Sequence, residues 1–235
     1  MTTEAPPPRV ALVTGAASGI GAAVAGSLRD RGWRVAGLDL RESPTDLPLT
    51  ADVADRAAVQ AAADRTGREL GPVQALVTAA GVYAMSPVVD IGTDAWRRML
   101  AVHLGGVANA CWAVVPSMLT AGAGSIVTIS SELAIAGGCR DAHYAAAKGA
   151  IIGFTRSLGA ELAPRGIRVN SVAPGPTDTP LLEADSPWRA PDYLATLPLR
   201  RLVAPEEVAA TVVFVLSEQA NFAGQVLSPN AGAVI

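Results

Sequence analysis

The stretch RVALVTGAASGIG, residues 9–21, joins a short apolar run to a glycine-rich turn and then to a segment rich in alanine. The run at 9–14 has the length of a buried strand, and Gly15, Gly19 and Gly21 leave room for a tight turn into a helix. A helix that starts at such a turn directs unpaired backbone N–H groups into the space beyond the strand. The stretch therefore predicts a strand, a turn and a helix, with either an anion site or a plain tight turn between them.

The same alternation continues along the chain. Strands that are apolar throughout are buried on both faces of a sheet, and strands that alternate with helices form a parallel sheet. We therefore predict an α/β fold of Rossmann type, a doubly wound parallel sheet of about seven strands with helices on both faces. It forms a single domain over 9–235, preceded by a disordered lead-in at 1–8. Further strands are expected at 34–40, 73–81, 124–131 and 166–175, and helices at 55–70, 93–119 and 142–163.

Composition excludes several classes of partner. The net charge of -3 comes from 18 basic and 21 acidic residues without a basic run, so nucleic acid is not an expected partner. Cys111 and Cys139 are too few and too far apart for a disulfide framework or a zinc site, so we expect reduced thiols, no metal and a cytoplasmic location.

A membrane span is considered at 99–129, which contains no Asp, Glu, Lys or Arg. Pro116, Gly122 and Gly124 interrupt this stretch, and its spacing changes from helix-like to a Val/Ile-rich run near Ile126. The N-terminal MTTEAPPPR also lacks the basic start and apolar run of a signal peptide. We therefore predict a buried helix followed by a buried strand, and no membrane partner.

In a doubly wound sheet, ligands bind beyond the carboxyl ends of the strands, which makes the glycine turn a candidate cradle for the pyrophosphate of a dinucleotide. Asp39 ends the second predicted strand, where its carboxylate can accept hydrogen bonds from the adenosine ribose. A 2′-phosphate there would bring roughly -1.5 to -2 charges against it. NAD is thus favoured over NADP, although Arg41 could turn toward a phosphate and Asp39 could instead be a solvated turn residue.

The motif YAAAK places Tyr144 and Lys148 four positions apart on a predicted helix. Such residues share a face at ~5 to 6 Å between Cβ atoms. An ammonium at that distance favours phenolate by ~3 kcal/mol at an effective dielectric near 20, which lowers the pKa of the phenol. A phenol tuned in this way performs general acid–base catalysis on an alcohol or a carbonyl. Taken alone, the motif is also typical of a surface helix pair.

Together, the motifs resemble the short-chain dehydrogenase/reductase family from about Arg9 to Gly232. The resemblance rests on TGAASGIG, YAAAK, the serines of IVTISS and the segment APGPTDT at 173–179. It implies that Ser131, thirteen positions before Tyr144, holds the substrate oxygen and that Lys148 binds the nicotinamide ribose while lowering the tyrosine pKa. The cofactor-binding residues that it implies are Gly15, Ser18, Gly19, Ile20, Gly21, Asp39, Asp52, Val53, Ala80, Gly81, Tyr144, Lys148, Pro174, Gly175, Thr177 and Thr179.

The chain departs from the family pattern at two places. Thr78 and Ala79 replace two asparagines before Ala80 and Gly81, and we expect this change to affect stability more than chemistry. His103 stands where the family places the asparagine of a catalytic tetrad. We hypothesise that its imidazole joins the proton relay, which the reference pKa near 6.5 would permit. The alternative is a buried histidine that fills space and bonds a backbone carbonyl.

The predicted function is hydride transfer between a nicotinamide cofactor, NAD in preference to NADP, and a secondary alcohol or its ketone. Tyr144 is the acid or base, Lys148 tunes it, Ser131 binds the oxygen and His103 joins the relay. The segment at 181–201, with Trp188 and Tyr193, is expected to form a substrate lid or to pack down. Further candidate pocket residues are Tyr83, Met85, Leu133, Ile135 and His143.

Three other functions stay open. One is an NADP(H)-preferring reductase of 3-oxoacyl thioesters. Another, suggested by Ala79 and His103, is a nucleotide-responsive binding protein with little catalysis, and the third is a scaffold. The resemblance also implies a homotetramer, or a dimer, that packs through the helices predicted at 93–119 and 142–163.

Overall fold

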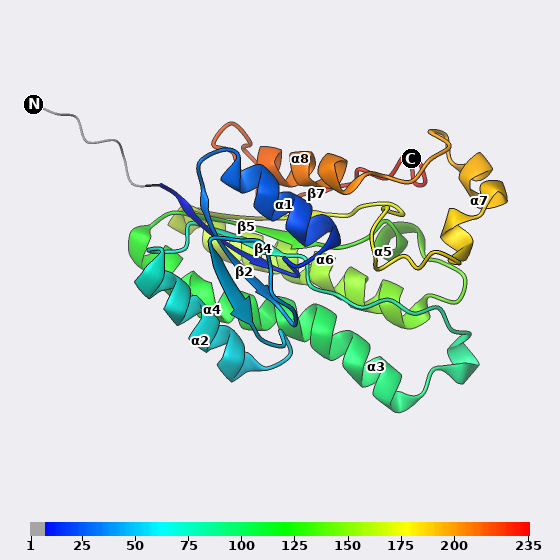
Figure 1. Ribbon diagram of the computed structural model, residues 1–235, viewed down its shortest axis with the longest axis horizontal. Coiled ribbons are helices and arrows are strands. Elements are labelled where there is room, and N and C mark those ends of the chain that lie inside the picture. The colour runs from blue at the N-terminus through cyan, green and yellow to red at the C-terminus, as the bar shows by residue number, and fades with distance from the viewer. Residues whose placement is uncertain (1–7) are drawn as a thin grey trace, which may run out of the picture.

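The computed structural model of the chain describes residues 8–235 (Figure 1). Seven strands form one sheet in the order β3-β2-β1-β4-β5-β6-β7, and every neighbouring pair is parallel. This confirms the predicted doubly wound parallel sheet and its strand number. The predicted lead-in lies, except for its last residue, outside the described residues. The strands are β1 (Val10–Thr14), β2 (Arg34–Asp39), β3 (Leu47–Thr50), β4 (Ala75–Thr78), β5 (Gly124–Ile129), β6 (Ile167–Val172) and β7 (Val226–Leu227).

Helices cover both faces of this sheet. Two of them, α1 and α8, pack on one face, and α2, α4 and α6 pack on the other (Figure 1). The shorter helices α3, α5 and α7 lie toward one end of the molecule, away from the N-terminus (Figure 1). The helices are α1 (Gly19–Arg29), α2 (Arg56–Glu69), α3 (Thr93–Leu100), α4 (Gly106–Ala121), α5 (Leu133–Ala136), α6 (Ala142–Leu162), α7 (Pro191–Thr196) and α8 (Pro205–Leu216).

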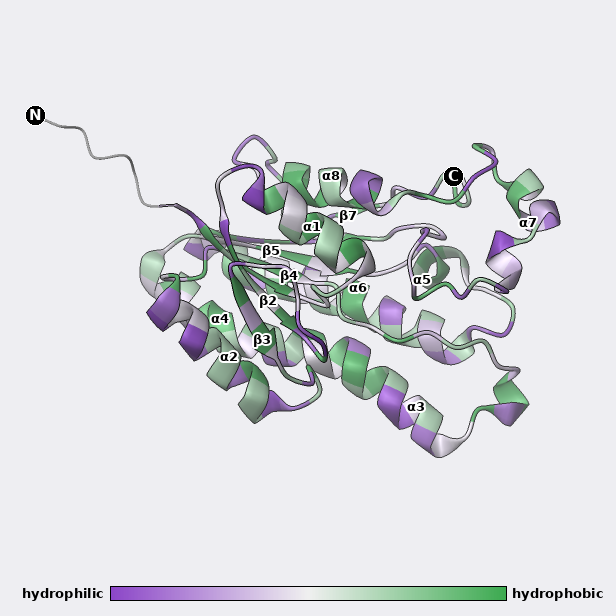
Figure 2. Ribbon diagram, viewed as in Figure 1, coloured by the Kyte–Doolittle hydropathy of each residue, from purple (hydrophilic) through white to green (hydrophobic). Residues whose placement is uncertain are grey.

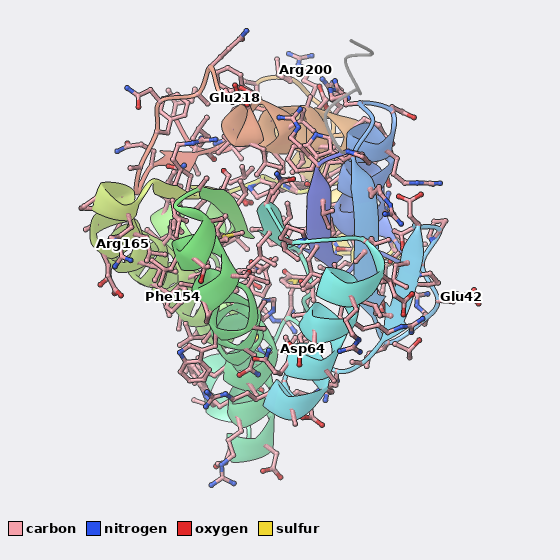
Figure 3. The ribbon with its side chains drawn as sticks, turned by 90° about the vertical axis from the view of Figure 1, so that its left-hand side faces the viewer. Glu42, Asp64, Phe154, Arg165, Arg200 and Glu218 are labelled. Carbon is pink, nitrogen blue, oxygen red and sulfur yellow. The ribbon has the colours of Figure 1, made fainter. Side chains whose placement is uncertain are left out.

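The strands are apolar throughout because their two faces enter two separate cores. Leu12 of β1 packs in the core beneath α2, α4 and α6, whereas its neighbours Ala11 and Val13 pack in the core beneath α1 and α8. Successive strand residues point to opposite faces, so both sets must be apolar. The hydrophobic colours of Figure 2 accordingly run along whole strands, while labelled charged residues such as Glu42, Asp64 and Arg165 lie on the outside in Figure 3.

Two strands were not predicted individually. The edge strand β3 has the sequence LPLT, and its Pro48 removes a backbone donor, which is tolerated at an edge. The other edge strand, β7, has only two residues and pairs with the end of β6. Neither carries enough apolar pattern to be recognised, because both lie at the borders of the sheet rather than in its buried centre.

The helix predicted at 93–119 is divided into three parts. A π-helical turn at Ala101–Gly105 connects α3 to α4 and carries His103, which is 1% exposed. The continuous stretch Thr93–Ala121 is long and apolar enough to cross a bilayer, but half of its most apolar window is buried inside the protein. Val107, Ala110 and Met118 pack in the core beneath α4, as expected for a core helix of this fold.

Candidate active site

The glycine turn between β1 and α1 is built as the sequence predicts. Gly15 has φ +71°, and its N–H donates to the Leu38 carbonyl of β2 at 2.8 Å. Helix α1 then begins at Gly19, and its N-cap residue Ser18 makes no capping hydrogen bond through its side chain. The first turn of α1 therefore offers backbone N–H groups and the positive end of the helix dipole to a ligand, which suits a pyrophosphate.

We expect Gly21→Ala to destabilise the protein and to abolish nucleotide binding. A Cβ at position 21 would collide with the carbonyl oxygen of Gly15, a backbone atom that cannot move without distorting the turn. Overpacking of this kind costs about 1–3 kcal/mol, which corresponds to a fall in Tm of roughly 2–10 °C. Thermal unfolding and titration with NADH would measure both effects.

The matched control is Gly26→Ala in the same helix. A Cβ at Gly26 meets nothing within 4 Å, so the variant should gain about 0.5–1 kcal/mol from higher helix propensity. Equal stability of the two variants, or tight NADH binding by Gly21→Ala, would contradict the packing role of Gly21.

Asp39 closes the other side of this cleft. Its Oδ2 accepts from the Ala17 N–H at 3.0 Å, and its Oδ1 accepts from the Arg41 N–H at 3.1 Å. The Arg41 guanidinium donates to the Ser18 hydroxyl at 3.0 Å, which brings the arginine to the same pocket. The carboxylate is thus held at the end of β2, where it can accept bonds from a ribose.

A cavity of about 540 Å³ runs along the carboxyl edge of β1, β2 and β4. Its lining fits a dinucleotide, because an uncapped helix start meets a carboxylate at the ribose position. It adjoins a second cavity of about 110 Å³, with which it shares Ile20, Ala79, Gly81, Thr179 and Leu181. The first cavity includes the predicted residues Gly15, Ser18, Gly19, Ile20, Gly21, Asp39, Asp52, Val53, Ala80, Gly81 and Thr179, and the second includes Ser131, Tyr144, Lys148, His103, Pro174, Gly175 and Thr177.

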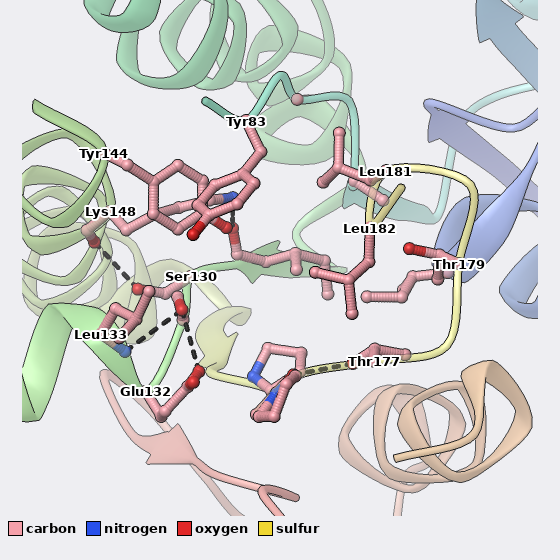
Figure 4. Close-up of a pocket in the computed structure, with 18 of the residues that line it drawn as sticks. Tyr83, Ser130, Glu132, Leu133, Tyr144, Lys148, Thr177, Thr179, Leu181 and Leu182 are labelled. Carbon is pink, nitrogen blue, oxygen red and sulfur yellow. Dashed lines mark hydrogen bonds between the residues drawn. The ribbon is translucent and has the colours of Figure 1, made fainter. Parts of the chain in front are cut away.

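Tyr144 and Lys148 lie on α6, and the pair enters this second cavity as predicted (Figure 4). The ring of Tyr144 packs edge-on against Tyr83 at 4.9 Å and against His103 at 5.4 Å between ring centroids. The Lys148 ammonium lies 5.7 Å from the centre of the Tyr144 ring and donates to the Ile129 carbonyl at 2.8 Å. The backbone of β5 therefore fixes the lysine head beside the phenol.

The two serines after β5 have different surroundings. The Ser130 hydroxyl donates to the Lys148 carbonyl at 2.8 Å, which ties the strand end to α6. The Ser131 hydroxyl accepts from the Leu133 N–H at 3.2 Å and donates to the Glu132 carboxylate at 2.9 Å. Both residues line the cavity, but the bond of Ser130 to the helix backbone gives it a structural role, in keeping with the choice of Ser131.

The expected lowering of the Tyr144 pKa is wrong for the protein without cofactor. Burial raises the pKa of the Tyr144 phenol, and the nearby Glu132 carboxylate raises it further, while the Ser131 hydroxyl opposes both. Burial also lowers the pKa of Lys148 to about 7, so this side chain is only partly charged at neutral pH. The dry surroundings of the pair thus disfavour the charged form of both side chains.

His103 bonds a backbone carbonyl, as the packing alternative requires. Its Nε2 lies 2.8 Å from the Val82 carbonyl, and its Nδ1 is buried without a hydrogen-bond partner among the described residues. Burial, together with the charge of Lys148, lowers the pKa of His103 to about 3. The imidazole is therefore neutral near pH 7 and orders the loop after β4 beside Tyr144.

We expect His103→Asn to leave the shape of the pH profile of kcat unchanged. The reason is that the imidazole does not titrate in the working range, so its removal takes no ionising group from the site. The measurement is turnover from about pH 6 to about pH 9 in the variant and the parent. Loss of one limb of the profile would instead support a proton-relay role for this histidine.

The segment 181–201 crosses the substrate end of the cleft. The Trp188 indole N–H donates to the Tyr83 hydroxyl at 2.6 Å, and Tyr83 donates to Oδ1 of Asp141 at 2.9 Å. Trp188 also packs edge-on against Tyr193, with 4.7 Å between ring centroids. Arg189 donates to the carbonyls of Thr179 and Leu182 at 3.3 and 3.0 Å, which anchors the segment beside the nucleotide cavity.

Three of the five additional pocket candidates lie elsewhere. Tyr83 and Leu133 line the cavity, but Met85, Ile135 and His143 do not. Ile135 is 52% exposed because α5 is a single short turn that directs it outward. His143 lies on another face of α6, against the edge of Trp96 at 5.9 Å. For Ile135 and His143 the reason is that nearness to the motif does not decide which way a side chain points.

Glu132 is the residue that sequence reasoning missed. It is 7% exposed, lines the cavity and holds the Ser131 hydroxyl, and burial raises the pKa of its carboxyl group to about 7. The signal was an acidic residue directly after the candidate serine and before the apolar stretch LAIA at 133–136.

Comparisons with known proteins agree with this architecture. A family model described as enoyl-(acyl carrier protein) reductase matches residues 15–233. The chain is 38% identical to cis-4-hydroxycyclohexanecarboxylate dehydrogenase of Sinomonas cyclohexanicum, over 95% of this chain and 96% of the relative. It is also 38% identical to D-threitol dehydrogenase of Mycolicibacterium smegmatis, over 90% and 87% of the two chains.

A solved structure shows the same fold. The 3-ketoacyl-(acyl-carrier-protein) reductase from Brucella melitensis, complexed with NADH, superposes with a TM-score of 0.91 at 27% sequence identity. The superposition covers 97% of this chain and 99% of that one. Because the family model and these relatives span nearly the whole chain, the chain belongs to the short-chain dehydrogenase/reductase family.

Proposed function

We propose that the protein is an NAD(H)-dependent oxidoreductase that interconverts a secondary alcohol and its ketone. The observation that carries this proposal is the convergence of Ser131, Tyr144 and Lys148 on one cavity that adjoins the nucleotide cleft. The relatives are alcohol dehydrogenases and reductases by name, which supports the reaction class.

A nicotinamide cofactor, when bound in this cleft, would supply or accept the hydride. Ser131 holds the substrate oxygen, and Tyr144 takes the hydroxyl proton in oxidation or returns it to the carbonyl oxygen in reduction. Lys148, fixed by the Ile129 carbonyl, lies within electrostatic reach of the phenol and favours its ionised form when the ammonium is charged. Because burial raises the pKa of Tyr144, the phenol is protonated in the free protein and ready to act as an acid.

NAD is the proposed cofactor. The Asp39 carboxylate is held by two backbone N–H groups at the ribose position, where it would oppose a 2′-phosphate. Arg41 stands close enough to compete for such a phosphate, since it already reaches Ser18. The carboxylate nevertheless sits at the strand end itself, which favours the unphosphorylated ribose.

The test is turnover of a panel of secondary alcohols and ketones with NAD and NADP in parallel, followed by the absorbance of the reduced nicotinamide. The panel includes threitol, 4-hydroxycyclohexanecarboxylate and a 3-oxoacyl thioester, since relatives are named for these classes. Oxidation of alcohols with NAD supports the proposal. Reduction of the thioester alone, with NADPH, would support the second candidate function, and binding of nucleotide without turnover would favour a nucleotide-responsive protein.

The assembly and location are proposed with it. Trp112 of α4 is 54% exposed and Phe214 of α8 is 48% exposed, although both are large and apolar. Such side chains favour contacts between copies of this chain, and we propose a homotetramer, with light scattering as the measurement.

The described thiols, buried Cys111 and exposed Cys139, are both free, which supports a reducing cytoplasmic location.

A further inference from the structure

The carboxyl group of Glu132 lies beside the place where the substrate oxygen is expected. Figure 4 shows Glu132, Tyr83 and Tyr144 pointing into the same cavity from different elements. Its apolar lining includes Leu133, Pro176, Leu181, Leu182 and Trp188. Within the described residues the carboxylate forms no ion pair, and the ammonium of Lys148 is engaged by the Ile129 carbonyl. An acceptor of this kind in an apolar pocket favours a ligand that brings a hydrogen-bond donor.

Glu132 also competes with the substrate for Ser131. The serine has one hydroxyl hydrogen, and that hydrogen is directed at Oε2 of Glu132 across 2.9 Å. A substrate with one hydroxyl group needs the Ser131 hydrogen to bind its reacting oxygen. Binding such a substrate therefore breaks the bond from Ser131 to Glu132, and the buried carboxylate loses one hydrogen-bond donor. Leaving such a group unsatisfied is costly.

A second hydroxyl on the neighbouring carbon removes this conflict. The two oxygens of a gauche vicinal diol lie about one hydrogen-bond length apart, which matches the spacing between Ser131 Oγ and Glu132 Oε2. One oxygen can then bind at Ser131 and Tyr144 while the other donates to Glu132. The serine hydrogen becomes free to turn toward the reacting oxygen.

We propose that Glu132 is a specificity-determining residue that selects vicinal diols, and α-hydroxyketones in the reverse direction. The inference rests on the proposed function. The diol loses one hydride from its reacting carbon and one proton from the oxygen on that carbon. The second hydroxyl stays intact throughout and serves only in recognition.

The charge of Glu132 adds a pH dependence. Burial raises the pKa of this carboxyl to about 7, so the carboxylate acceptor is present above that pH and is lost below it. The titratable groups in the cavity with it are Tyr83, His103, Tyr144 and Lys148, and Asp141 and Tyr193 act on the same pocket from outside its lining. Of these only Lys148, whose pKa burial lowers to about 7, carries positive charge near neutrality. Preference for a diol should therefore rise with pH through neutrality.

The test compares kcat/KM for 1,2-cyclohexanediol with cyclohexanol, and for 2,3-butanediol with 2-butanol, using NAD. In the parent protein, kcat/KM for the diol should exceed kcat/KM for the mono-alcohol by roughly tenfold or more, because only the diol donates a hydrogen bond to the charged carboxylate. Glu132→Leu should reduce the ratio toward unity. Glu132→Gln should keep part of it and remove its rise between about pH 6 and about pH 8. Lys148 affects both substrates of a pair alike, so its titration cancels in the ratio.

The matched control is Glu161→Gln on α6. Glu161 is an exposed carboxylate that lines neither cavity, so its neutralisation should leave the ratio within about twofold. A ratio of diol to mono-alcohol near unity in the parent protein, or a ratio that is unchanged in both Glu132 variants, overturns the proposed role of Glu132. In that case, turnover of the mono-alcohols still supports the proposed function. If no alcohol of either kind is oxidised, the proposed function itself fails.

Discussion

Tyr144→Phe is expected to lower kcat by about a thousandfold or more, at the upper end of what a general acid or base contributes. The variant lacks the phenol hydroxyl that exchanges a proton with the substrate oxygen. The aromatic ring and its contacts with Tyr83 and His103 remain. The nucleotide cleft is unchanged, so NADH affinity should stay within about twofold, because removal of a single hydroxyl there breaks no cofactor cradle. Single-turnover kinetics and NADH titration measure the two quantities.

The control for this variant is Tyr193→Phe. Tyr193 is another partly buried phenol of the same end of the cleft, and burial raises its pKa to about 12. It packs against Trp188 and lies outside the cavity lining, so we expect a change in kcat of less than about tenfold. Full activity of Tyr144→Phe would refute the assignment, and equal losses in both variants would show a general disturbance of the pocket.

Asp39→Ser is expected to shift the cofactor preference by about a hundredfold toward NADP, measured as the ratio of kcat/KM with the two cofactors. The substitution removes a charged acceptor of ribose hydrogen bonds, worth about 1.5–3 kcal/mol, and relieves its repulsion of the 2′-phosphate. Arg41, whose guanidinium bonds Ser18 at the same pocket, is then free to pair with that phosphate.

Two further variants separate these contributions. Asp39→Asn keeps the side-chain shape that caps Ala17 but removes the charge, so it isolates the repulsion. Asp39→Ser combined with Arg41→Ala should lose most of the gained NADP activity. A parent protein that uses NADP as well as NAD, or a ratio that does not move in Asp39→Ser, would contradict the role of the carboxylate.

The fold was predictable because buried parallel strands are apolar on both faces. β1, β2, β4, β5 and β6 all lie within the predicted runs. The edge strands were not predicted because a strand at the border of the sheet does not need a continuous apolar sequence. The clearest case is β3, whose sequence is LPLT. The π-helical turn also escaped, since its five residues continue the same apolar pattern as the helices on either side.

The placement of the candidate site residues could be predicted from the sequence better than their pKa values could. The glycine turn, Asp39, Ser131, Tyr144 and Lys148 come from motifs whose spacing is fixed by the fold, so they converge on adjoining cavities. The pKa of Tyr144 could not be read from spacing, because it depends on burial and on Glu132, which lies twelve positions away along the chain. Side-chain direction likewise excluded Ile135 and His143 from the cavity.

The chain of bonds from Trp188 through Tyr83 to Asp141 links the segment 181–201 to the helix that carries Tyr144. A product that left past this segment would have to separate the indole from the phenol. In many enzymes of this design such opening limits the turnover rate. Trp188 is one of four tryptophans in the chain, so a change in emission that is present in the parent and lost in Trp188→Phe would report movement of this segment during product release.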